Sequence, residues 1–70
     1  MNRELIDLLK NGKKLTRKIW TYKQYIFMEG ETLYIYWCAD KEQPFIKEAN
    51  QDNFPYEELF EEDWVVFSED

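Results

Sequence analysis

Aromatic and basic side chains alternate over one short stretch of this sequence, and together they could bind a small anion that carries flat rings. The stretch contains Arg17, Lys18, Trp20, Tyr22, Tyr25 and Phe27. Nucleobases stack on flat side chains, while guanidinium and ammonium groups bind phosphate. Rings beside lysines occur on any aromatic-rich sheet, because basic stems often lie along strands. From this pattern alone we predict only a small domain that binds a ligand or a protein partner.

Catalytic chemistry has little support in the composition. The chain contains no histidine, which removes the commonest general base and a common metal ligand. Gly12 and Gly30 stand apart, so neither a phosphate loop nor a dinucleotide motif can form. The acidic residues of 57–63 do not have the spacing of a calcium loop, and they favour a solvated patch. We expect no enzyme activity, no cofactor and no metal; a hydrolase that uses paired carboxylates is the weakest alternative.

Charge is distributed unevenly along the chain. Residues 1–35 hold seven basic and four acidic residues (+3), and residues 36–70 hold two basic and eleven acidic residues (−9), which together give the net charge of −6. Neutralisation of phosphates drives general nucleic-acid binding, so we expect no direct binding to nucleic acid. The acidic half could instead oppose a basic surface on another protein.

Length and composition predict one domain over residues 1–70 that binds a ligand or another subunit. A chain of 70 residues buries roughly 60% of its unfolded surface. Aromatic residues make up 19% of the sequence, more than so small a core hides easily, so a ligand or another subunit is expected to cover part of them. No apolar run is long enough to span a membrane, and the N-terminus has no signal-peptide pattern. The single Cys38 fits a reducing, intracellular setting.

The elements that must position these residues can be read from periodicity. Arg3 to Lys10 has the apolar spacing of a helix, with Asn2 as a candidate N-cap and Asn11-Gly12 as the C-cap. Leu15 to Trp20 alternates as a strand, which would place Arg17 and Trp20 on opposite faces. Tyr25 to Met28 and Leu33 to Cys38 predict a hairpin around Gly30, and the second strand is apolar on both faces.

The second half of the chain predicts shorter elements. A charged loop, Ala39 to Pro44, precedes a short strand at Phe45 to Lys47, and Asn50, Asp52 and Asn53 are turn formers. Pro55 opens a helical turn over Tyr56 to Phe60, with Leu59 and Phe60 expected to pack inward. Trp64 to Phe67 is the last strand. The fold class predicted is α+β: an N-terminal helix packed on a mostly antiparallel sheet, with a short helical turn before the last strand.

Two separated blocks of the sequence resemble a known family. Leu8 to Trp20, with its Lys-x-Gly-Lys and Arg-x-x-Trp, is followed by the aromatic strand Tyr25 to Met28. Glu58 to Val66 is similar to the family's closing block, in which an acidic-leucine pair precedes Glu-Asp-Trp-x-Val. The family is the small phage proteins that include the second type of Thoeris anti-defence protein. The match covers about half of the chain, at both ends.

The resemblance implies a sponge that acts in the cytoplasm of an infected bacterial host. Such proteins bind a cyclic ADP-ribose derivative made by an immune TIR enzyme, and some relatives bind cyclic dinucleotides, in each case without cleaving the ligand. They form homotetramers with ligand pockets between subunits, so we expect a homo-oligomer, either a dimer or a tetramer. The segment after Trp20 and the short middle region depart from the family pattern, and such segments usually form the pocket walls.

Matched position by position, the resemblance places ligand-binding roles on Arg17, Trp20, Phe27 and Asp63. Tyr25, from the stretch of aromatic and basic residues, is the fifth candidate ligand-binding residue. Trp20 or Phe27 would stack a base, Arg17 would bind phosphate, and Asp63 would accept a hydrogen bond from a ribose hydroxyl or a base amine. Asp63 as a turn cap and Trp64 as a core ring are the structural alternative. The competing function is an anti-CRISPR-type inhibitor, whose acidic C-terminal half would block the nucleic-acid groove of a host defence nuclease; at least one anti-CRISPR resembles the same family.

Overall fold

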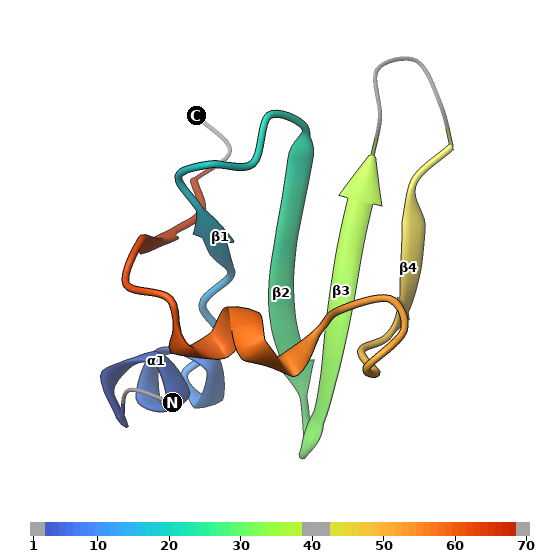
Figure 1. The fold of residues 1–70 in the computed structure, drawn as a ribbon. Helices are drawn as coiled ribbons and strands as arrows, with labels where there is room; N and C mark the ends of the chain where they lie inside the picture. Colours follow the sequence, from blue (N-terminus) through green and yellow to red (C-terminus); the bar gives the residue numbers. More distant parts are fainter. Residues whose placement is uncertain (1–2, 39–42, 69–70) are drawn as a thin grey trace.

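The fold is an α+β domain, as the sequence predicts (Figure 1). The computed structural model describes residues 3–38 and 43–68. In chain order its elements are α1 (Arg3–Lys10), β1 (Leu15–Arg17), β2 (Lys23–Glu29), β3 (Thr32–Cys38), β4 (Phe45–Glu48), the 3-10 helix η1 (Tyr56–Phe60) and β5 (Trp64–Val66). Asn2 and most of the predicted loop at Ala39 to Pro44 lie outside the described residues.

The five strands form one antiparallel sheet in the order β4-β3-β2-β1-β5. Strands β1 and β5, which come from opposite ends of the chain, are therefore neighbours. The two edge strands are β4 and β5. Both α1 and η1 lie over the same face of the sheet, where η1 crosses β2 (Figure 1). Every described strand has residues on a second, opposite face that no helix covers.

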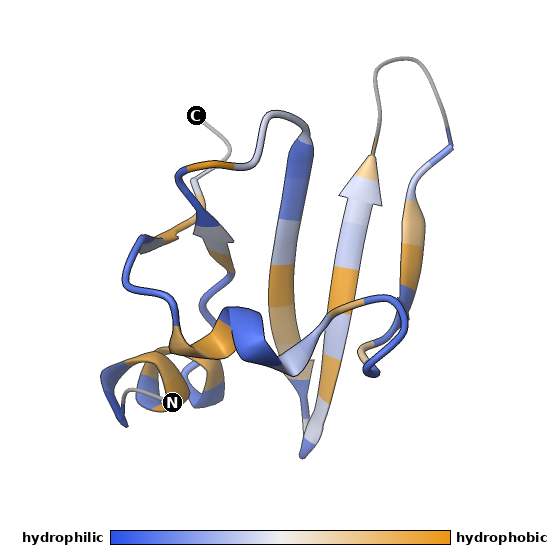
Figure 2. Ribbon diagram, in the orientation of Figure 1, coloured by the Kyte–Doolittle hydropathy of each residue, from blue (hydrophilic) through white to orange (hydrophobic). Residues whose placement is uncertain are grey.

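The core lies between the helices and the sheet. Four strands each contribute one buried member, and α1 and the loop before η1 contribute one each; the six are Leu9, Leu15, Ile26, Ile35, Phe54 and Trp64. Figure 2 shows the hydrophobic bands in the middle of β2 and β3 and where η1 meets α1. Leu15, Ile26 and Phe54 are completely buried, so the loop residue Phe54 closes the core over the sheet.

Helix α1 ends where the sequence predicts. Gly12 has φ 84°, which a residue without a Cβ adopts at no steric cost. The backbone N–H of Gly12 donates to the carbonyl of Leu9 and that of Lys13 to the carbonyl of Leu8, at 3.1 and 3.0 Å. These bonds satisfy the last carbonyls of the helix, and they turn the chain directly into β1.

The prediction of a continuous strand from Leu15 to Trp20 is wrong. Strand β1 ends at Arg17, and the Trp20 N–H donates to the Arg17 carbonyl at 3.1 Å, which closes a tight turn at Lys18 and Ile19. The last pair of the β1–β5 ladder is Arg17 with Trp64. The turn breaks the alternation, so Arg17 and Trp20 do not lie on opposite faces as predicted.

A second error concerns η1. Leu59 packs against the core as expected, but Phe60 is 71% exposed. A turn of only five residues presents one narrow side to the sheet, and Leu59 occupies it. The remaining differences are at element ends: β2 begins at Lys23, β3 at Thr32, β4 extends to Glu48, and β5 ends at Val66 rather than Phe67.

Candidate functional site

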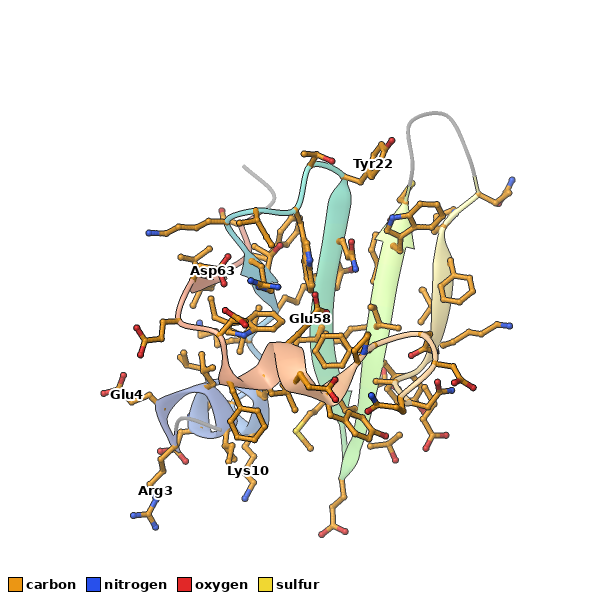
Figure 3. All side chains as sticks on the ribbon, in the orientation of Figure 1. Arg3, Glu4, Lys10, Tyr22, Glu58 and Asp63 are labelled. Atoms are coloured by element: carbon orange, nitrogen blue, oxygen red, sulfur yellow. The ribbon has the colours of Figure 1, made fainter. Side chains whose placement is uncertain are left out.

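Arg17 is at the centre of a group of three carboxylates on the helix-covered face. Its Nε lies 2.8 Å from Asp63 Oδ1, its Nη1 3.1 Å from Glu58 Oε1, and its Nη2 3.9 Å from Glu61 Oε2. Figure 3 shows Glu58 on η1 and Asp63 just before β5, on the same side of the sheet. We call these four residues the arginine cluster. It links β1 to η1 and to the start of β5.

Electrostatics reinforce this cluster. The hydrogen bond with Asp63 raises the pKa of Arg17, and the same bond lowers the pKa of Asp63 below its ordinary value of 3.8. The Arg17 side chain is 9% exposed. A phosphate that bound Arg17 would have to displace carboxylates that already accept its hydrogen bonds. Within one chain the arrangement therefore favours a structural role for Arg17 and Asp63.

Asp63 nevertheless retains an unused acceptor. Its Oδ2 is buried and meets no hydrogen-bond partner within bonding geometry among the described residues, although the backbone N–H groups of Ile19 and of Asp63 itself help to lower the pKa of this carboxyl. A buried acceptor without a partner is costly, so a hydroxyl or amine that reached it would be bound favourably. Because the atom is shielded from solvent, neighbouring side chains would have to move to admit such a donor.

Trp20 lies over the same face as the arginine cluster. Its ring meets Trp64 edge-on, with centroids 5.2 Å apart, and Trp64 is the register partner of Arg17 across β1 and β5. Trp64 in turn contacts Phe54 and donates from Nε1 to the Glu58 carbonyl at 2.8 Å. The turn at Lys18 and Ile19 therefore brings Trp20, Arg17 and Asp63 to one region.

Tyr25 and Phe27 lie on the opposite, uncovered face of the sheet. Tyr25 stacks with Tyr36 and with Phe67, at centroid distances of 4.5 and 4.8 Å. Phe27 stacks with Tyr34 at 5.5 Å and meets Tyr25 at 5.8 Å. These five rings come from β2, β3 and the residue after β5. We call them, with the two lysines described next, the aromatic face.

Two ammonium groups lie over these rings. Lys14 Nζ is 4.9 Å from the Tyr25 centroid, and Lys23 Nζ is 5.6 Å from that of Tyr36 and 6.0 Å from that of Phe67. A cation over a ring face is attracted by its quadrupole. Desolvation raises the pKa of Tyr36, so its hydroxyl stays protonated at neutral pH.

The structure thus divides the five predicted site residues between two faces of one sheet. Arg17, Trp20 and Asp63 come together on the covered face, and Tyr25 and Phe27 come together on the aromatic face. Their roles in ligand binding stay predictions, but a single pocket within one chain does not contain all five.

Sequence reasoning missed five members of the aromatic face: Lys14, Lys23, Tyr34, Tyr36 and Phe67. A signal for two of them was present. A two-residue turn at Gly30 and Glu31 fixes the hairpin register, which pairs Tyr25 with Tyr36 and Phe27 with Tyr34. Phe67 and Lys14 required knowledge of the β1–β5 pairing, which joins the two ends of the chain.

Residues 3–38 and 43–68 contain no group of three or more histidine, cysteine or acidic side chains placed to hold a metal ion. No helix in these ranges is long and apolar enough to cross a membrane. Comparisons with protein-family models, with curated proteins and with solved structures find no match to this chain.

Proposed function

We propose that this protein is a phage anti-defence sponge that binds a cyclic nucleotide immune signal and holds it without cleaving it. The observation that supports this best is the aromatic face, where stacked rings and ammonium groups lie together on a sheet surface that no helix covers. A nucleotide has the matching parts: flat bases and anionic phosphates. The ligand is a cyclic ADP-ribose derivative or a cyclic dinucleotide.

In this proposal the half-buried rings of Tyr36 and Phe67 stack the bases, and Lys23 and Lys14 bind the phosphates. Tyr25 is 6% exposed, so it supports its two neighbours from below rather than contacting the ligand broadly. Phe27 and Tyr34 extend the stacked surface along the hairpin. The neighbouring rings are already held in parallel planes, so little side-chain freedom is lost when a base is added.

A homo-oligomer, dimer or tetramer, places a second subunit over this face in the proposed assembly, and the pocket then lies between subunits. Trp20 contributes from another subunit, and so does Asp63 Oδ2 once the side chains that cover it have moved. Such an arrangement supplies the walls that one small sheet lacks, and it accounts for two groups of predicted ligand residues on opposite faces. The proposed setting is the cytoplasm of the infected bacterium.

Recovery of an intact ligand tests the proposal. Purified protein is incubated with cyclic ADP-ribose or a cyclic dinucleotide, separated from free ligand and heated, and the released compound is quantified by mass spectrometry. Release of unaltered ligand in proportion to protein supports sequestration, while turnover would indicate the hydrolase alternative. Absence of binding to every cyclic nucleotide tried would show that the proposal is wrong.

The competing function, inhibition of a host nuclease by the acidic C-terminal half, has a separate test. Charge mimicry requires exposed carboxylates such as Glu57 and Glu62. Co-purification with the nuclease should weaken with added salt and with their neutralisation. Inhibition that survives both changes would exclude charge mimicry without affecting the nucleotide proposal.

A further inference from the structure

A groove of about 650 Å³ lies between α1, η1 and β5, on the face opposite the aromatic rings. Its apolar lining includes Leu5 and Leu8 of α1 and Leu59 and Phe60 of η1, and its acidic lining includes Glu61 and Glu62. Leu5, Leu8 and Leu59 also pack against the core, so the groove lies at the edge of the core.

Apolar side chains stay exposed along this groove. Phe60 is 71% exposed and Val66 is 49% exposed, although both line it. Large apolar groups gathered in a concave surface are typical of interaction sites, because covering them removes apolar area from water. The occupant of this groove must therefore supply apolar side chains.

The charge of the lining is one-sided. Glu61 is 58% exposed at its side chain, and Glu62 is also exposed. No lysine or arginine is among the described residues that line the groove. Arg17 approaches Glu61 only at 3.9 Å and is bound more closely by Asp63 and Glu58. An occupant that carries lysine or arginine is complementary to this rim, and an acidic one is repelled.

The backbone of β5 offers hydrogen bonds beside the groove. Asp63 accepts from Lys18 at 3.1 Å and Phe67 donates to Lys14 at 2.8 Å, both toward β1. Bonded residues alternate in an antiparallel ladder, so Trp64 and Val66 direct their backbone groups to the open side. Strand β5 is the last in the sheet, with no further described strand beside it.

We infer that the β5 edge and this groove dock an extended, basic segment of another protein. The segment pairs with β5 through its backbone, presents apolar side chains to Phe60 and Val66, and directs a lysine or arginine to Glu61 and Glu62. Strand addition at an exposed edge is an established mode of peptide recognition. The site is separate from the nucleotide proposal, because the lining of the groove includes none of the residues to which that proposal gives a role.

The test uses the full chain, labelled with ¹⁵N, and a short capped peptide in which lysine and leucine alternate. We expect amide shifts concentrated in α1, η1 and β5. A glutamate–leucine peptide should not bind, and a lysine–serine peptide should bind far more weakly. Phe60→Ser should weaken binding about tenfold, since it removes a ring that the bound peptide would cover. Glu62→Gln should weaken it about twofold, as expected for an exposed ion pair with a lysine of the peptide.

Matched controls are Ile46→Ser on edge strand β4 and Glu31→Gln in the hairpin turn, which should leave binding unchanged. Phe60 is mostly exposed, so its replacement should not unfold the chain, and the ¹⁵N spectrum of each variant checks this. Shifts confined to the aromatic face, equal binding of the serine peptide, or no binding would each overturn the inference. So would an oligomer that dissociates on Phe60→Ser, since a second copy would then occupy the groove.

Discussion

Arg17 Nε donates to Asp63 Oδ1 at 2.8 Å, across 46 positions of sequence. This contact joins the N-terminal and C-terminal parts of the chain, because Arg17 ends β1 and Asp63 precedes β5. The pair therefore fixes how the ends of the chain meet, and with them the positions of Trp20, Trp64 and Phe67.

The Arg17–Asp63 pair predicts a specific dependence of stability on pH. The pKa of Asp63 is lowered in the folded state by Arg17, so its stabilising effect is complete above the ordinary value of 3.8 and is lost as pH falls through the folded value. The free energy of unfolding should decrease in this acidic window. Urea denaturation at several pH values measures the decrease.

Asp63→Asn should remove that part of the pH dependence and lower stability at neutral pH. Arg17→Met made in both backgrounds completes a double-mutant cycle, in which the coupling should be present at neutral pH and disappear in acid. If the unfolding free energy varies with pH to the same extent in the wild type and in Asp63→Asn, the Arg17–Asp63 pair is not the source of the pH dependence.

The completely buried loop residue Phe54 should be essential for stability. In the native chain the Phe54 and Trp64 ring centroids are 6.1 Å apart. Phe54→Ala would leave a cavity beside Trp64 and should lower the unfolding free energy by about 3–5 kcal/mol. Ile46→Ala, at a side chain 55% exposed, is the matched control and should change stability by less than about 1 kcal/mol. Urea denaturation compares the two, and similar losses would show that Phe54 is not part of the core.

The hairpin turn at Gly30 has a conformational requirement. Its φ is 62°, and no heavy atom lies near enough to meet an added Cβ. The cost of Gly30→Ala is therefore backbone strain alone, about 1–2 kcal/mol. Gly30→Asn should cost less, because asparagine tolerates the left-handed region. Thermal unfolding ranks the variants, and equal losses for alanine and asparagine would argue against strain as the cause.

Ligand binding distinguishes the two faces of the sheet. Phe67→Leu should weaken cyclic nucleotide binding about tenfold if the aromatic face stacks a base, and Lys23→Gln should weaken it and reduce its dependence on salt. Trp20→Leu tests the covered face. Titration calorimetry of each variant gives the affinities. If only Trp20→Leu weakens binding, the ligand binds on the covered face and the aromatic face has another role.

The assembly can be tested in the same preparations. Because the proposed pocket lies between subunits, Tyr34→Lys, which adds a charge to the aromatic face, should shift the protein toward the monomer in light scattering. Glu31→Gln makes the same +1 change in net charge in the exposed hairpin turn and should leave the assembly unchanged. A monomeric wild type that still binds ligand would exclude the subunit arrangement while leaving sequestration possible.

Local sequence was sufficient for the elements whose signals are local. Helix α1 was predicted at its exact ends, because apolar spacing and Asn11-Gly12 act within a few residues. The β2–β3 hairpin and the turn after Pro55 follow from equally short-range preferences. Errors occurred where a longer-range contact decides the outcome: Trp20 turns away because β1 stops pairing at Arg17, and Phe60 stays outside because Leu59 already occupies the face of η1 toward the core.

The sequence by itself therefore determined the kinds of elements, the excess of aromatic residues and the presence of basic groups near them. Tertiary structure alone decided which of these groups meet. Arg17 is bound by carboxylates 41 and 46 positions away, and Tyr25 receives Phe67 from the far end of the chain. Side-chain periodicity assigns a residue to a face of its own strand, but strand order determines its neighbours on that face. That order depends on which pairing buries the most apolar surface, a property of the whole chain.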